Sequence, residues 1–205
     1  MKRYRPNELL ERYRAIRDAT TTEAFFRDPA HKKTQEIWCA AHFSRGYEKH
    51  HGECFVLISD VDEQTDADFE LEVGGSRRPF QVTELMQPGR RRGDEYRGGG
   101  SGRTILEDWG PGTAYGAAWV REAVERKVKK RYAAARELNL LVYLNFPAYE
   151  QRFDRIAEEC EEAAKHFASV WLLNGNAICC IREGNGFEHT DGWLPIEESL
   201  ADADL

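Results

Sequence analysis

The chain has 205 residues, of which 41% are hydrophobic and 11% aromatic, and its formal net charge is −7. This composition is typical of a globular protein and excludes wholesale disorder. The length suits a single domain over residues 1–205, with N-terminal helices and a polar C-terminal tail. No apolar run approaches the length of a membrane span, and no apolar segment follows the charged N-terminus. We therefore expect a cytoplasmic protein without a secretory signal or a membrane partner.

The cysteines and the charge distribution narrow the function classes further. Five cysteines, at positions 39, 54, 160, 179 and 180, form no Cys-x-x-Cys pair, which indicates reduced, buried thiols and neither a disulfide framework nor a zinc site. Residues 146–205 hold 13 acidic against four basic residues, whereas residues 1–145 carry a balance of +2. A polyanion could bind the N-terminal part, although a solvated charged face is the alternative.

The first half of the chain predicts two helices followed by three strands. Leu9, Leu10 and Tyr13 recur at helical spacing after Pro6, and Asp28-Pro29 begins a second helix that continues to about Tyr47. Residues 54–58 form a short apolar run that predicts a buried strand. Residues 68–73 and 80–86 predict a hairpin that is closed by a turn at 74–76.

The second half predicts alternating helices and strands after a long loop. Residues 87–113 are rich in glycine, proline and arginine, and a loop of this length is usually functional or disordered. Helices are expected over 114–138 and 149–167, and strands over 140–146, 169–173 and 177–181. This order predicts an α/β fold with a mixed central β-sheet flanked by helices on both faces.

The predicted hairpin places chemistry-bearing side chains on one face. Side chains alternate along a strand, so Asp68 and Glu70 share a face opposite to Phe69 and Leu71. The hydrophobic pattern selects the register that puts Gln81 and Thr83 on the face of Asp68. Glu84 then falls on the apolar face unless the strand bends before it.

The element order, together with Asp68-Phe-Glu-Leu and Gln81-Val-Thr-Glu84, resembles the PD-(D/E)XK nuclease superfamily. That pattern has an Asp at the start of one strand, and a Glu or Gln, a spacer and usually a Lys on the next. The resemblance implies a restriction-endonuclease-like fold and a metal-dependent nuclease that hydrolyses phosphodiester bonds in DNA or RNA. Here Thr83 stands where the superfamily usually has its lysine, which leaves catalysis open.

The resemblance implies a Mg²⁺ or Mn²⁺ site in which Asp68 and Gln81 are ligands, with Glu84 as a further candidate and the Val82 carbonyl as a contributor. Such a cation polarises the scissile phosphate and lowers the pKa of an attacking water. Asp68, Gln81 and Thr83 are the expected catalytic positions on the strands. Lys127 is expected to replace the absent strand lysine, because it interrupts the apolar stripe of the 114–138 helix.

Nucleic acid is the expected partner, and a homodimer stays an open alternative. Phosphate contacts are expected from five arginines near the predicted site: Arg90, Arg91, Arg92, Arg97 and Arg131. Each assignment has a simpler alternative: Lys127 and Arg131 could extend along the helix to water, Asp68 could be a solvated strand acid, and the arginine loop could be solvated. A second hypothesis for the whole chain is a catalytically inactive nuclease-fold module that binds nucleic acid or a protein.

Overall fold

The computed structural model describes residues 1–59, 66–90, 109–130 and 136–196. Over these residues the strands form one eight-stranded sheet in which β1 to β8 are neighbours in sequence order. The three central strands β4, β5 and β6 run parallel, and every other neighbouring pair is antiparallel. The predicted α/β fold with a mixed sheet is confirmed.

The helices are α1 (Pro6–Asp18), α2 (Thr22–Arg27), the 3₁₀ turn η1 (Pro29–His31), α3 (Lys32–His51), α5 (Gly110–Val128) and α6 (Phe153–Ala164). The strands are β1 (Lys2–Tyr4), β2 (Phe55–Ile58), β3 (Phe69–Val73), β4 (Ser76–Met86), β5 (Asn139–Asn145), β6 (Val170–Leu173), β7 (Ala177–Arg182) and β8 (Leu194–Pro195). These bounds match the predicted order and correct several predicted ends.

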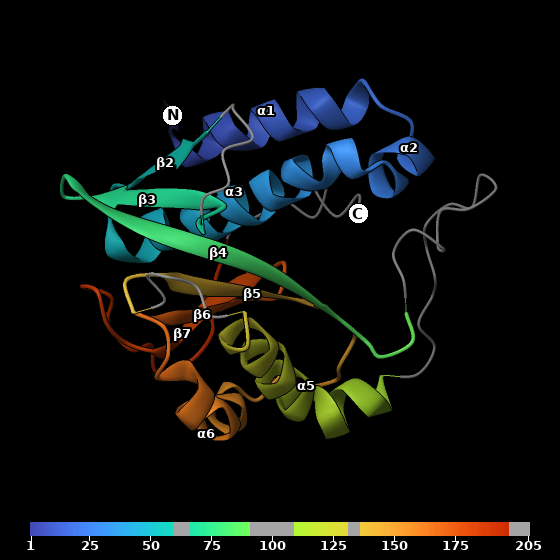
Figure 1. Ribbon diagram of the computed structural model, residues 1–205, viewed down its shortest axis with the longest axis vertical. Helices are drawn as coiled ribbons and strands as arrows, with labels where there is room; N and C mark the ends of the chain where they lie inside the picture. The colour runs from blue at the N-terminus through green and yellow to red at the C-terminus, as the bar shows by residue number, and fades with distance from the viewer. Residues whose placement is uncertain (60–65, 91–108, 131–135, 197–205) are drawn as a thin grey trace.

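The sheet separates two hydrophobic cores. Figure 1 shows α1, α2 and α3 on one side of the sheet and α5 and α6 on the other. In the first core the rings of Phe69 and Phe80 stack with centroids 4.9 Å apart, and Phe43 of α3 packs on Phe80 at 5.1 Å. Aromatic pairs of this kind add to the free energy gained by burying their area. Strand alternation therefore sends Phe80 and Val82 toward α3, and Leu85 toward α5.

The β3–β4 hairpin has the predicted register. Gly74 and Gly75 form a two-residue turn, and both have positive φ, as a tight hairpin turn requires. Phe69 pairs with Phe80, so Asp68 comes opposite Gln81 on the same face. The strand β4 begins at Ser76 and not at residue 80, because the arginines at 77 and 78 pair with β3 even though they interrupt the apolar pattern.

Several predicted ends were wrong for local reasons. The helix expected from Asp28 instead begins at Lys32, after the 3₁₀ turn, and it ends at His51. The helix expected over 114–138 spans Gly110–Val128, since a proline is favoured at a helix start. Its Gly112 lies so close to the following strand end that a Cβ would meet the Pro147 carbonyl oxygen at 1.9 Å. The short elements β1, α2 and β8 were not predicted from the sequence.

Two further expectations concern the whole chain. Within the described ranges, no helix is long and apolar enough to cross a membrane. All five cysteines are free thiols and buried, as the sequence indicated.

Candidate functional site

The candidate site lies at the N-terminal start of β3, where the β3–β4 pairing stops and β4 continues without β3 beside it. The Asp68 amide donates to the Phe80 carbonyl oxygen at 2.8 Å, next to the first residue of β3. Beyond this point β4 runs on to Met86, and the Asp68 side chain takes the place of the missing strand: its Oδ2 accepts the Val82 amide at 2.7 Å. The local end of the β3 ladder therefore positions a carboxylate at the open edge of β4.

Gln81 supports this carboxylate. Its Nε2 donates to the same Oδ2 of Asp68, so in this arrangement Gln81 is a hydrogen-bond donor and not a second oxygen ligand. Among the described residues, no hydrogen bond reaches Asp68 Oδ1. Asp68 thus has one oxygen fixed by β4 and a second oxygen that could accept a cation or a substrate proton.

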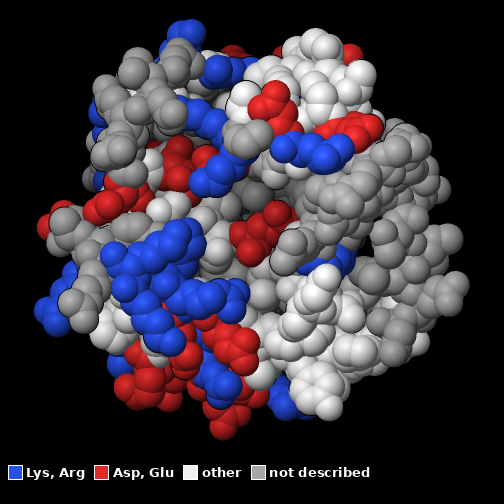
Figure 2. Space-filling view, turned by 45° about the vertical axis from the view of Figure 1, so that its right-hand side comes forward, with Lys and Arg blue, Asp and Glu red and all other residues white. Residues whose placement is uncertain are grey.

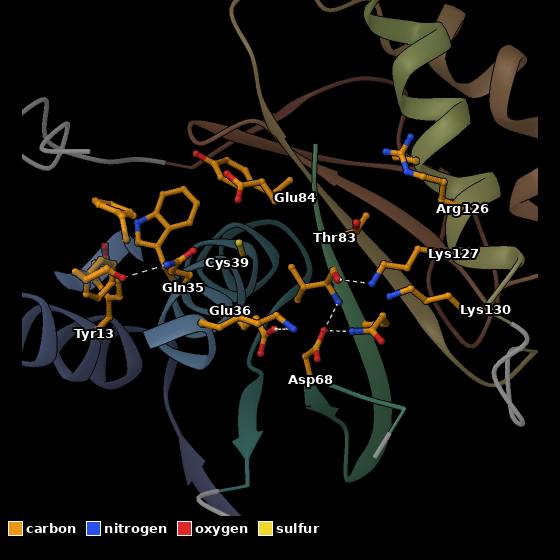
Figure 3. Close-up of a pocket in the computed structure, with 18 residues that line it drawn as sticks. Tyr13, Gln35, Glu36, Cys39, Asp68, Thr83, Glu84, Arg126, Lys127 and Lys130 are labelled. Atoms are coloured by element: carbon orange, nitrogen blue, oxygen red, sulfur yellow. Dashed lines mark hydrogen bonds and ion pairs between the residues drawn. The ribbon is translucent and has the colours of Figure 1, made fainter. Parts of the chain in front are cut away.

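Lys127 also contacts Val82 of β4, through the carbonyl group of that residue. It lies one turn beyond Ala123 and Val124, which are buried against the sheet, so it projects from the inner face of α5. Its Nζ donates to the Val82 carbonyl oxygen at 2.9 Å (Figure 3). The structure therefore brings Asp68, Gln81 and Lys127 together, and the Val82 carbonyl that was expected to contact a metal accepts a lysine hydrogen bond instead.

Glu36 of α3 is a site residue that was not predicted from the sequence. Figure 3 shows it approaching Asp68 from the side opposite to Lys127. Burial and, second, the charge of Asp68 raise the pKa of Glu36 above its ordinary value. A signal was present: Glu36 precedes the buried Ala40, Phe43 and Tyr47 at helical spacing, and so interrupts an apolar stripe as Lys127 does.

Burial shifts the pKa values of the charged groups of the site toward their neutral forms. Burial raises the pKa of the Asp68 carboxyl, although the Val82 amide and Lys127 act in the opposite direction. Burial also lowers the pKa of Lys127 to about 8 from 10.5, with Lys130 adding to the shift and Asp68 opposing it. Charged groups with such shifted pKa values in a cavity are candidates for function, because the fold alone gains nothing from burying them.

We predict that Glu36→Gln stabilises the protein at pH 7 by about 0.5–1 kcal/mol, because it removes a desolvated charge that repels Asp68. The lost ion pair with the exposed Lys32, at 3.4 Å, should matter little. Urea denaturation checks this, with Glu53→Gln as the control, since Glu53 pairs with Arg5 on the exposed surface. A clear loss of stability in Glu36→Gln would show that the carboxylate is a structural partner.

Lys127 gives a pH-dependent prediction. Its pKa in the folded protein, about 8, lies below its ordinary 10.5, so the unfolded chain binds this proton more tightly. The group therefore subtracts stability below pH 8, and this loss disappears as the pH rises toward 10.5. Compared with Lys127→Met, the wild type should gain free energy of unfolding between pH 8 and pH 10 in urea titrations. A constant difference between the two proteins would contradict the shift.

The other predicted residues lie at different distances from this centre. Thr83 lines the same cavity on the face of Gln81, whereas Glu84 lies on the opposite face of a regular β4 and accepts Asn145 Nδ2 at 2.5 Å. Arg90 donates to the carbonyl oxygen of Asn145, the last residue of β5, at 2.9 Å. Arg91, Arg92, Arg97 and Arg131 lie outside the described residues. The nucleic-acid roles of these arginines stay predictions.

One cavity of about 450 Å³ is lined by the site residues described above: Glu36, Asp68, Gln81, Thr83, Glu84 and Lys127. Its charged lining residues are Lys32, Glu36, Asp68, Glu84, Arg126, Lys127 and Lys130. Figure 2 shows basic and acidic side chains side by side around a hollow on the face in view, with no single sign covering the described surface there. The site therefore combines acidic residues of α3 and of the β3–β4 region with basic residues of α3 and of the C-terminal end of α5.

The cavity offers a divalent cation two carboxylates, from Asp68 and Glu36, near the β4 edge. Within the part of the chain that the structure describes, no three His, Cys, Asp or Glu side chains form a group that could hold a metal. Mg²⁺, however, commonly binds one or two carboxylates and completes its shell with water and substrate phosphate. Asp68 and Glu36 repel each other across the cavity, and a cation between them would relieve that repulsion. Asp68 and Glu36 are thus the carboxylates of this cavity that could supply protein ligands to such a cation.

No protein-family model, no curated protein and no solved structure matches this chain.

Proposed function

We propose that the protein is a metal-dependent nuclease with a restriction-endonuclease-like fold that hydrolyses phosphodiester bonds in DNA or RNA. One observation carries the proposal: Asp68 and Lys127 bind the amide and the carbonyl of Val82, respectively, at the open edge of β4. Asp68 and Lys127 meet at a strand edge, in a cavity that also contains the Glu36 carboxylate. Such a set of groups can bind and polarise a phosphate, whereas its burial does not favour folding.

Asp68 and Glu36 are the residues that would bind the cation, and Mg²⁺ or Mn²⁺ suits their oxygen ligands. When bound, the metal supplies polarisation of the scissile phosphate and a lowered pKa of an attacking water. Gln81 fixes the Asp68 carboxylate through its Nε2 donor. A 180° rotation of that amide would present its oxygen to a cation beside Asp68, as the sequence analysis expected.

Lys127 stabilises negative charge that develops on the phosphate. Its ammonium has three donors, and one of them is used by the Val82 carbonyl oxygen. The fixed position of this hydrogen bond orients the remaining donors before substrate arrives, which is the condition under which a charged donor lowers a barrier. Arg126 lies on α5 and Lys130 lies two residues past the end of that helix. Both line the same cavity, where they can bind the flanking phosphates.

A second candidate is a catalytically inactive module that binds nucleic acid or a protein. The specific observation in its favour is that a threonine occupies the strand position of the superfamily lysine while Lys127 is bonded to the Val82 carbonyl. In this alternative the Lys127 ammonium neutralises the buried carboxylates permanently, and no metal enters.

A cleavage assay separates the two candidates. The full chain is incubated with single-stranded and double-stranded DNA and RNA in Mg²⁺, in Mn²⁺ and in EDTA. The nuclease proposal predicts cleavage in at least one metal and none in EDTA. Retained nucleic-acid binding without cleavage in either metal would favour the inactive module and reject the nuclease.

A further inference from the structure

The cavity that contains the charged site has a second, aromatic wall. Its aromatic lining residues are Tyr13, Phe25, Phe26, Trp38 and Tyr143. Trp38 and Tyr143 lie with ring centroids 4.9 Å apart, and Phe26 packs edge-on against Phe25 at 5.0 Å. These rings come from α1, α2, α3 and β5. Phe26 is half-buried and the other four are buried, so Phe26 has the most exposed ring of the wall.

The two walls belong to one space of limited size. About 450 Å³ is within the range of small-molecule sites, roughly 300–1,000 Å³. Figure 3 shows Arg126, Lys127 and Lys130 at one end of it, and Tyr13 and Gln35 at the other, with the β4 edge between them. If the phosphate of a nucleotide bound at the charged end, the attached nucleoside could therefore extend into the aromatic end.

The geometry points to a nucleobase subsite formed by this aromatic wall, and so to single-stranded nucleic acid as the substrate. The inference rests on the proposed nuclease function and names its substrate class. A base stacked inside a duplex cannot enter a protein cavity unless it is first extruded, whereas an unpaired base can enter without that cost. Cationic groups for the backbone beside aromatic rings for the bases are also the usual combination in single-strand binding sites.

The polar groups of the wall fit a base without fixing its identity. Gln35 Nε2 donates to the Phe25 carbonyl oxygen at 3.3 Å, which places an amide among the rings. Amides and tyrosine hydroxyls can bind the edges of unpaired bases, and stacking accepts every base because each has a π face. We therefore expect a preference for single strands with little sequence preference.

The test measures binding of adenosine 5′-monophosphate, ribose 5-phosphate and inorganic phosphate to the full chain in EDTA, by calorimetry. The subsite predicts that the nucleotide binds about 5- to 150-fold more tightly than ribose 5-phosphate, since stacking of one base on protein aromatic rings contributes about 1–3 kcal/mol. Phe26→Ala should reduce this ratio several-fold. The matched control is Phe153→Ala, because Phe153 is also half-buried but packs in the other core.

Equal affinity for the nucleotide and ribose 5-phosphate in the wild type would overturn the subsite, and this measurement needs no variant to fold. An equal loss of the ratio in both phenylalanine variants would also overturn it. The outcomes for the subsite and for the nuclease can be told apart. Metal-dependent cleavage together with equal affinities for the nucleotide and ribose 5-phosphate would retain the nuclease and reject the subsite. A clear preference for the nucleotide without any cleavage would retain the subsite and reject the nuclease.

Discussion

Replacing Asp68 with asparagine is expected to reduce metal-dependent cleavage by about 10³-fold or more, while the protein stays folded. The loss follows because the charge that binds the cation disappears, and a metal ion contributes several kcal/mol of transition-state stabilisation. The fold should tolerate the change, because an asparagine oxygen can still accept the Val82 amide that Asp68 Oδ2 now accepts at 2.7 Å. Initial cleavage rates and thermal melting of the purified variant give the two readouts.

The control for this variant is Glu72→Gln, on the same strand. Glu72 pairs with Arg3 at 2.8 Å and is not among the residues that line the cavity. Its neutralisation should leave cleavage within about twofold, in line with the small effect of an exposed ion pair. If Asp68→Asn cleaved as fast as the wild type, Asp68 would only accept the Val82 amide where the β3–β4 pairing stops, and it would have no part in the mechanism.

Lys127→Met is expected to lower the cleavage rate by about 10²–10³-fold, the size of effect found when one fixed donor to a developing charge is removed. Methionine keeps an unbranched side chain as far as the ε position but removes the ammonium that donates to the Val82 carbonyl oxygen at 2.9 Å. The effect should fall on kcat, because the donor acts on charge that develops in the transition state. Steady-state kinetics with saturating metal measure it.

Lys130→Met is the matched control for Lys127. Lys130 lines the same cavity on the next turn of the chain but is exposed, and no hydrogen bond fixes its ammonium to β4 in the described residues. Its loss should raise KM modestly through weaker phosphate binding and should leave kcat nearly unchanged. Equal losses of kcat in the two variants would show that only the total positive charge matters, and would remove Lys127 from its proposed position.

The fold was predictable wherever side-chain alternation and turn chemistry agreed. The Gly74-Gly75 turn and the apolar partners Phe69 and Phe80 fixed the hairpin register that places Asp68 opposite Gln81. Strand order could be inferred only in outline, because it depends on which apolar faces meet in space. The edge strands β1 and β8 have little pattern of their own, and they form only because neighbouring strands supply backbone partners.

The site was predictable in part, for the same physical reason. Asp68 and Gln81 follow from strand register, and Lys127 from a charge on an apolar helix stripe. Glu36 carries the same signal on α3, but its approach to Asp68 depends on how α3 packs across the sheet. The aromatic wall could not be predicted, because residues such as Phe26 and Tyr143 are far apart in sequence and resemble ordinary core positions.

We propose that Asp68 anchors a metal site that substrate completes, and calorimetry with Mn²⁺ can detect that site. The titration is made with the wild type and with Asp68→Asn, each in the presence of a single-stranded oligonucleotide whose backbone cannot be cleaved. We expect saturable Mn²⁺ binding in the wild type and its loss in Asp68→Asn. Equal Mn²⁺ binding in both proteins, or none in the wild type with oligonucleotide bound, would contradict it.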